Sequence, residues 1–246
     1  MPSIVWNRHP EEAYQNPYEH GAQKQFVKEA RKLLESLYTS YDRFNLTFSR
    51  DDKSLRKSIW MLQIDALDSL RDCLKALTLK QHRIASRLFR DVVETLDLAA
   101  YLQSNSSAAQ KNLRKWYEND VIQHSIYRDH IRTTLGQKAA ENSKQFYVDL
   151  SKFTHRTYRA LLKSYSLGRD NLMVYDSHHK SRSLVLPQTI AAFYATLAGL
   201  IRLFCSEASA RGMLTADEIK SAQEASLETS TVPRRFAQVW REGQSD

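Results

Sequence analysis

The chain has 246 residues, 42% of them hydrophobic and 26% charged, which is enough apolar material for the core of a soluble globular protein. No apolar run reaches the roughly 18 residues of a membrane span, and no apolar core follows a basic start at the N-terminus, so we expect a cytoplasmic protein with no membrane contact. The formal net charge of +8 favours an acidic partner such as RNA.

Few residues of this chain break helices, because it holds only 6 glycines and 5 prolines. The expected fold is therefore mainly α, a single helical-bundle domain of about six to seven helices. The prolines and the lack of periodicity in residues 1–18 predict an extended N-terminal arm. The bundle is expected over residues 19–230, followed by a loose tail over residues 231–246.

Apolar residues recur at helical spacing in the first half of the chain. They predict a helix from about His20 to Tyr41, a second from the capping residues 49–52 to Leu77, and a third over about residues 80–103. The third helix is apolar around more than half of its circumference, so we expect it at the centre of the bundle. A polar loop and a single helix over residues 113–131 should follow, with Gly136 ending that unit.

The second half begins with a helix near Lys138 that includes the stretch YVDLSKFTH. Residues 160–177 contain a Leu-Gly-Arg-Asp-Asn turn signal between two runs with tyrosine, which favours a small β-hairpin. Pro187 is placed to open the next helix, which should end near Gly212. Thr215 and Glu218 form a capping box for a final helix. The two cysteines, Cys73 and Cys205, fall in apolar helical positions and are expected as small buried residues in a reducing compartment.

Three hydrogen-bonding side chains, Tyr147, Ser151 and His155, follow one stripe of the predicted helix. At about 100° per residue, this stripe lies beside the apolar arc and away from the charged face, so these groups should sit at or inside the buried edge. Burying them without partners costs roughly 1–3 kcal/mol. One hypothesis is that Glu94 of the third helix orients His155 while Arg87 or Arg90 supplies a fixed positive charge. The alternative is that Arg90 and Glu94 form a surface ion pair.

The segment RLFRDVVETLDLAAYL, followed about fifty residues later by YVDLSKFTH, resembles the Arg-x3-Glu and Leu-Ser-x3-His pattern of a group of bacterial all-helical proteins. These proteins are similar to the HEPN superfamily, and the resemblance covers about residues 55–205. It implies an all-helical fold and a place in toxin–antitoxin or antiviral systems, where such domains often act as RNases. The chain departs from the catalytic signature, because no Arg is followed by His after four to six residues.

Two functions stay open at this level. The first is a helical interaction or regulatory protein, a homodimer, in which the polar stripe and Glu94 form a structural network. The second is a metal-independent RNase or an RNA-binding protein, in which a histidine acts as acid or base beside a fixed cation. Its catalytic candidates are His155, Glu94 and Arg90, and its binding candidates are Arg87, Tyr147, Ser151, Lys152, Arg156 and Arg159.

Neither a metal nor a cofactor is expected. His124 and His130 are six positions apart and point to different helix faces, while Asp176, His178 and His179 share a loop without fixed geometry. Zinc requires three or four converging ligands. The Glu-x2-His pairs of metal-binding helical bundles do not occur, and neither does a glycine-rich phosphate loop.

Overall fold

The computed structural model describes residues 17–79, 81–155, 157–158, 161, 165–167, 173–175 and 187–221. Its helices are α3 (Pro17–Asp42), α4 (Leu55–Thr78), α5 (His82–Gln103), α6 (Ser107–Tyr117), α7 (His124–Leu135), α8 (Gln137–Thr154) and α10 (Pro187–Ala210). The short antiparallel strands β1 (Tyr165–Leu167) and β2 (Met173–Tyr175) pair with each other. The mainly helical bundle is confirmed, and the hairpin forms within the predicted residues.

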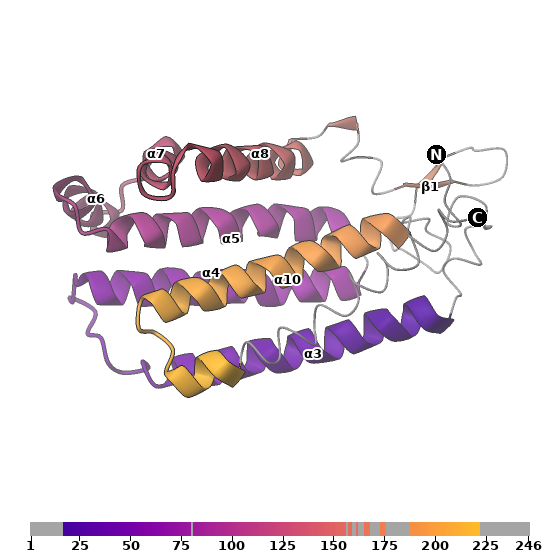
Figure 1. Cartoon of the computed structure of the whole chain (residues 1–246), viewed down its shortest axis with the longest axis horizontal. Coiled ribbons are helices and arrows are strands. Elements are labelled where there is room, and N and C mark those ends of the chain that lie inside the picture. The colour runs from indigo at the N-terminus through magenta and orange to yellow at the C-terminus, as the bar shows by residue number, and fades with distance from the viewer. Residues whose placement is uncertain are drawn as a thin grey trace.

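The long helices run side by side along the molecule, with α3 at one edge, then α4 and α10, then α5, and α7 with α8 at the opposite edge (Figure 1). Helix α5 contacts α4, α6, α7, α8 and α10 and buries Phe89, Val92 and Leu96. Its predicted central place is confirmed. Ile84, which the predicted apolar arc included, is instead exposed in the first turn of α5.

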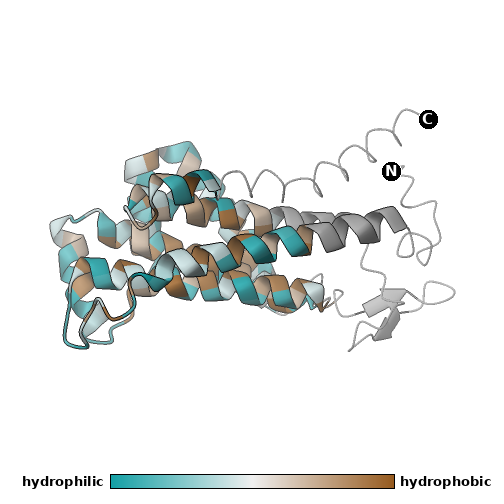
Figure 2. Cartoon of the chain, turned by 90° about the horizontal axis from the view of Figure 1, so that it is seen from below, coloured by the Kyte–Doolittle hydropathy of each residue, from teal (hydrophilic) through white to brown (hydrophobic). Residues whose placement is uncertain are grey.

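The core follows the predicted stripes of α4 and α10. Ser54 caps α4 by accepting a hydrogen bond from the Lys57 backbone N–H, and six predicted residues of α4 are buried: Ile59, Leu62, Ala66, Leu70, Cys73 and Leu77. Helix α10 covers them with Leu197, Ile201 and Phe204. Hydrophobic and hydrophilic residues accordingly alternate along the helices (Figure 2). Among the described residues, no helix combines the length and apolarity needed to cross a bilayer.

Two predicted boundaries require correction. Residues 113–131 do not form one helix, because α6 ends at Tyr117 and α7 begins at His124. Asn119, in the turn between them, has a left-handed φ of 67°, which an α-helix does not accommodate. Helix α3 begins at Pro17 rather than at His20 and so includes the last two residues of the predicted arm, because a proline in the first helical turn loses no hydrogen bond. The rest of that arm and the predicted tail lie outside the described residues.

Candidate functional site

The contact between α5 and α8 brings four of the predicted site residues together. Arg90 Nε donates a hydrogen bond of 2.8 Å to Glu94 Oε1, one turn further along α5. Arg90 Nη2 donates to the hydroxyl of Tyr147 on α8, and the Arg90 guanidinium carbon lies 4.8 Å from the centroid of the Tyr147 ring. Arg90 therefore contacts Tyr147 through both its hydroxyl and its ring.

The Tyr147 hydroxyl joins the two helices. It is hydrogen-bonded to Glu94 and to Ser151 as well as to Arg90. An ionised carboxylate only accepts hydrogen bonds, so Tyr147 donates to Glu94 and accepts from Arg90 and Ser151. Burial and the hydrogen bond to Glu94 raise the pKa of Tyr147 above its usual value. We call Arg90, Glu94, Tyr147 and Ser151 the polar network.

The protonation of the polar network follows from these contacts. Burial acts to raise the pKa of Glu94, but the hydrogen bonds from Tyr147 and Arg90 outweigh it and hold that pKa below its usual value. The side chains of Arg90 and Glu94 are 25% and 28% exposed, so water only partly screens their pairing. At neutral pH the network thus holds a guanidinium, a carboxylate and a neutral tyrosine.

Helix α7 adds two residues that were not predicted for this site. The His124 ring stacks on the Tyr147 ring, with centroids 4.1 Å apart and planes at 24°, and it meets Tyr127 edge-on at 4.9 Å. The Arg128 guanidinium carbon lies 5.5 Å from the Tyr147 centroid. Burial and the charge of Arg128 lower the pKa of His124, so its imidazole is neutral at pH 7. Its two ring nitrogens are buried without a hydrogen-bond partner among the described residues.

His155 does not join this network, contrary to the prediction. Helix α8 ends at Thr154, and His155 has extended backbone angles (φ −81°, ψ 121°), so the helical stripe stops before it. Its side chain is exposed rather than at the buried edge. The helical rise places it about 12 Å beyond Tyr147 along the axis. Among the contacts of the described residues none joins His155 to Glu94, whose partners are Arg90 and Tyr147.

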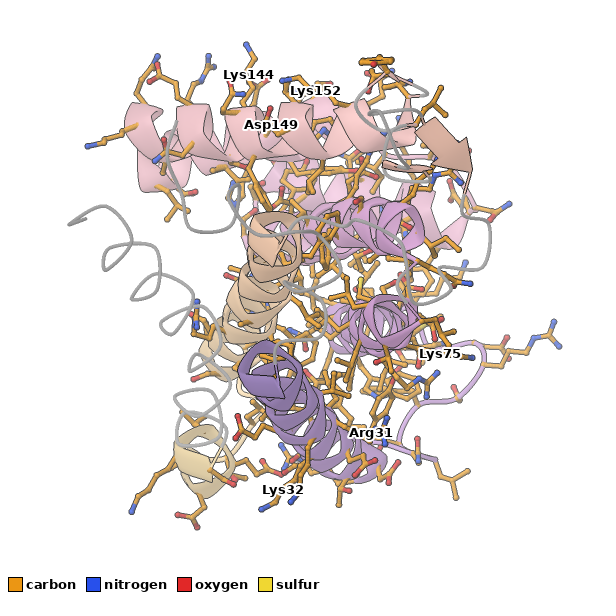
Figure 3. The ribbon with its side chains drawn as sticks, turned by 90° about the vertical axis from the view of Figure 1, so that its right-hand side faces the viewer. Arg31, Lys32, Lys75, Lys144, Asp149 and Lys152 are labelled. Atoms are coloured by element: carbon orange, nitrogen blue, oxygen red, sulfur yellow. The ribbon has the colours of Figure 1, made fainter. Side chains whose placement is uncertain are left out.

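The remaining predicted binding residues lie around the network or outside the described part of the chain. Arg87 is exposed on α5. Lys152 is exposed and forms an ion pair of 2.7 Å with Asp149. Figure 3 shows Lys144, Asp149 and Lys152 on the outer side of α8, away from the rest of the bundle. Arg156 and Arg159 lie outside the described residues.

A further acidic side chain extends the polar residues of α5 toward α10. Burial raises the pKa of Asp97 to about 7, and the carboxylates of Glu207 and Glu94 add to this shift. Asp97 Oδ2 is buried and has no hydrogen-bond partner among the described residues. Glu207 itself pairs with Arg211 one turn later on α10. A partly buried carboxyl group thus lies near other acids.

Tyr147→Phe removes the hydroxyl that Arg90, Glu94 and Ser151 share. We expect the free energy of unfolding to fall by about 1–2 kcal/mol, because the partly buried Arg90 loses an acceptor and Glu94 loses a donor. Urea denaturation followed by circular dichroism measures this change. Tyr158→Phe is the control, since Tyr158 is 72% exposed. An equal effect of the two substitutions would show that the Tyr147 hydroxyl contributes nothing.

The described residues do not bring three or more His, Cys, Asp or Glu side chains together as a metal site requires. His130, for example, packs edge-on against Tyr101 at 5.7 Å. Comparison with protein-family models, with curated proteins and with solved structures finds no match to this chain. Its own residues and their contacts are therefore the basis for any inference about function.

Proposed function

We propose that the chain is a helical interaction protein of regulatory type, in which the polar network is structural. The observation that supports this role most strongly is that the four network residues satisfy one another across the α5–α8 contact. Arg90 is neutralised by Glu94, whose pKa is lowered, while the pKa of Tyr147 is raised. A catalytic acid or base needs a pKa near the working pH, and these shifts move both groups away from it.

The proposed relationship is to HEPN-like proteins of bacterial defence or toxin–antitoxin systems. The Tyr147 hydroxyl joins Arg90 and Glu94 of the Arg-x3-Glu motif to Ser151 of the Leu-Ser-x3-His motif, and this contact supports the relationship. His155, the last residue of the second motif, lies outside the contact. The missing Arg-to-His spacing agrees with a member that regulates or binds rather than cleaves. Such a protein would act in the cytoplasm.

The proposed assembly is a homodimer. Val121 and Leu135 lie just before and at the end of α7 and are 92% and 70% exposed. Large aliphatic side chains at this exposure gain free energy when a second copy covers them, at about 25 cal/mol per Å² of apolar surface. We propose α7 and its two flanking turns as part of the contact between copies.

A second candidate function is RNA binding or metal-independent RNA cleavage through His155. It is favoured by the exposure of His155 and by its exposed basic neighbour Lys152. Arg87, also exposed, would add a phosphate contact from α5. In this function the outer face of α8 would meet the nucleic acid.

The test combines sedimentation velocity with an RNA cleavage assay on the purified protein. We expect the wild type to sediment as a dimer and to leave a labelled single-stranded RNA intact. His155→Ala should give the same two results. Val121→Ser combined with Leu135→Ser should give a monomer with nearly the same melting temperature, because both side chains are exposed. RNA cleavage by the wild type that His155→Ala abolishes would contradict the interaction role and support the second candidate. A monomeric wild type would contradict the homodimer.

A further inference from the structure

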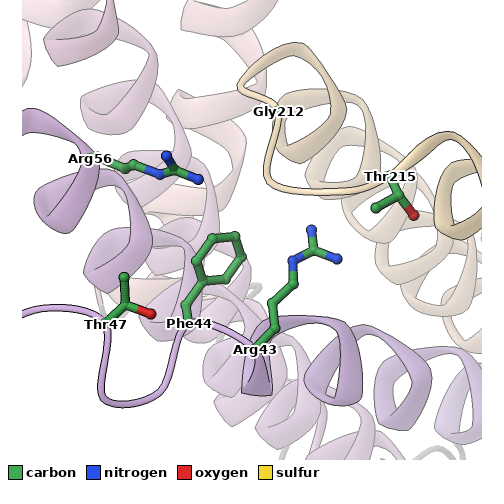
Figure 4. A pocket seen from close by; sticks show the side chains of 6 residues that line it. All are labelled: Arg43, Phe44, Thr47, Arg56, Gly212 and Thr215. Atoms are coloured by element: carbon green, nitrogen blue, oxygen red, sulfur yellow. The ribbon is translucent and has the colours of Figure 1, made fainter.

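A hollow of about 450 Å³ opens at the end of the bundle where the turn after α3 meets the turn after α10. It is lined by Arg43, Phe44, Thr47, Arg56, Gly212 and Thr215 (Figure 4). These residues come from the α3–α4 loop, the first turn of α4 and the turn after α10. The volume falls within the range of small-molecule sites, and none of these residues belongs to the polar network.

Arg43 joins the α3–α4 loop to the segment after α10 on two sides of this hollow. Its Nη1 donates hydrogen bonds of 2.7 and 2.6 Å to the two carboxylate oxygens of Glu218, and its Nη2 donates to the Met213 carbonyl. Burial acts to raise the pKa of Glu218, but the hydrogen bonds from Arg43 and from Thr215 help to lower it to about 2. The charge of Arg43 is therefore neutralised, and its position is fixed.

Arg56 supplies the positive charge that stays unneutralised. Its guanidinium carbon lies 5.8 Å from the centroid of the Phe44 ring, and no carboxylate among the described residues pairs with it. The nearby carboxylate of Asp52 accepts hydrogen bonds from the backbone N–H and the hydroxyl of Ser54. Lys57 Nζ, on the same turn as Arg56, donates to three backbone carbonyls and leaves its own charge uncompensated. Arg56 therefore places at the hollow a guanidinium that is unpaired within the described part of the chain.

The other lining groups suit an anionic ligand. Phe44 is 5% exposed and presents its ring between the guanidinium groups of Arg43 and Arg56 (Figure 4). The exposed hydroxyl of Thr47 can donate a hydrogen bond. Thr215 Oγ1 already accepts from the Glu218 backbone N–H, which leaves its own proton available for an anion.

We propose that this hollow binds a small anion, with a carboxylate or phosphate group paired with Arg56. Guanidinium groups bind both kinds of oxyanion through two parallel hydrogen bonds. This site stands apart from the proposed interaction role and does not depend on it.

The test is a titration of isotope-labelled protein followed by NMR, with phenylacetate and phenyl phosphate as anionic probes and benzylamine and benzyl alcohol as controls. We expect saturable shifts of the Thr47, Gly212 and Thr215 amides with the two anions. In Arg56→Gln the affinity should fall about tenfold or more, because a charge-assisted pair is lost. Arg31→Gln, which changes an exposed arginine on α3, should bind as the wild type does (Figure 3).

The outcomes separate as follows. Tighter binding of phenyl phosphate than of phenylacetate identifies phosphate esters as the ligand class, and the reverse order identifies carboxylates. The proposal is wrong if neither anion gives saturable shifts at these amides. It is equally wrong if Arg56→Gln binds both anions unchanged, or if benzyl alcohol binds as well as they do.

Discussion

Replacing Asp97 with Asn is expected to stabilise the protein by about 2–4 kcal/mol at about pH 8 and to change little near pH 4. Burial raises the pKa of Asp97 to about 7 in the folded state, whereas an exposed aspartate has a pKa of 3.8. At a pH between these two pKa values, Asp97 keeps its proton in the folded protein but has released it in the unfolded chain. The stability contributed by this group is therefore present below the lower value and is lost as the pH rises to about 7.

The ionisable groups near Asp97 do not reverse the direction of this pH dependence. Glu94 on α5 and Glu207 on α10 are both acidic and raise its pKa. Burial, with the charges of Glu94 and Asp97, raises the pKa of Tyr127 on α7 to about 12. Denaturation curves of wild type and Asp97→Asn at both pH values test the prediction. Asp129→Asn is the control, because Asp129 is 70% exposed. A stability difference that does not vary with pH would contradict it.

Leu150→Ala is expected to lower the free energy of unfolding by about 2–4 kcal/mol, the usual cost of a cavity at a buried leucine. Leu150 is 5% exposed, and it is the buried residue among the α8 side chains that the structure describes. In the described part of α8, Leu150 and the polar network therefore attach the helix to α5 and α7. We expect the loss of the Leu150 side chain to let α8 open locally before the core unfolds.

Hydrogen exchange distinguishes this local opening from global unfolding. The amides of α8 should exchange faster in Leu150→Ala, while those of α4 keep most of their protection. Val148→Ala is the matched control, since Val148 is 38% exposed and should change stability by less than about 0.5 kcal/mol. Equal acceleration in α4 and α8 would show that α8 does not open independently.

The helices could be predicted from sequence where the spacing and type of neighbouring residues define them. The α4 stripe and its Ser54 cap can be recognised from spacing and residue type alone. The turn between α6 and α7 was missed because the apolar residues Leu113, Tyr117, Ile122 and Ile126 keep nearly helical spacing across it. Residues 118–123 lie outside both helices, and Asn119 among them has a left-handed backbone, which asparagine adopts more readily than most residues.

The sequence predicts two separate pairs of the candidate site but not the contact between them. Arg90 with Glu94 and Tyr147 with Ser151 are pairs four residues apart, and their shared helix faces follow from that spacing. Their meeting depends on the packing of α8 on α5, which one sequence does not reveal. The same holds for His124, whose stacking on Tyr147 depends on how α7 lies against α8. His155 was misplaced because the stripe was extended one residue past the end of α8.

The contact between Arg43 and Glu218 joins positions 175 residues apart, and α10 packs on α4 and α5 from a similarly late point in the chain. During synthesis, α3, α4 and α5 leave the ribosome long before the helix that covers them. A nascent chain therefore displays the apolar surfaces later closed by Leu197, Ile201 and Phe204 until translation passes Ala210. During this interval these surfaces are apolar targets that a chaperone can bind.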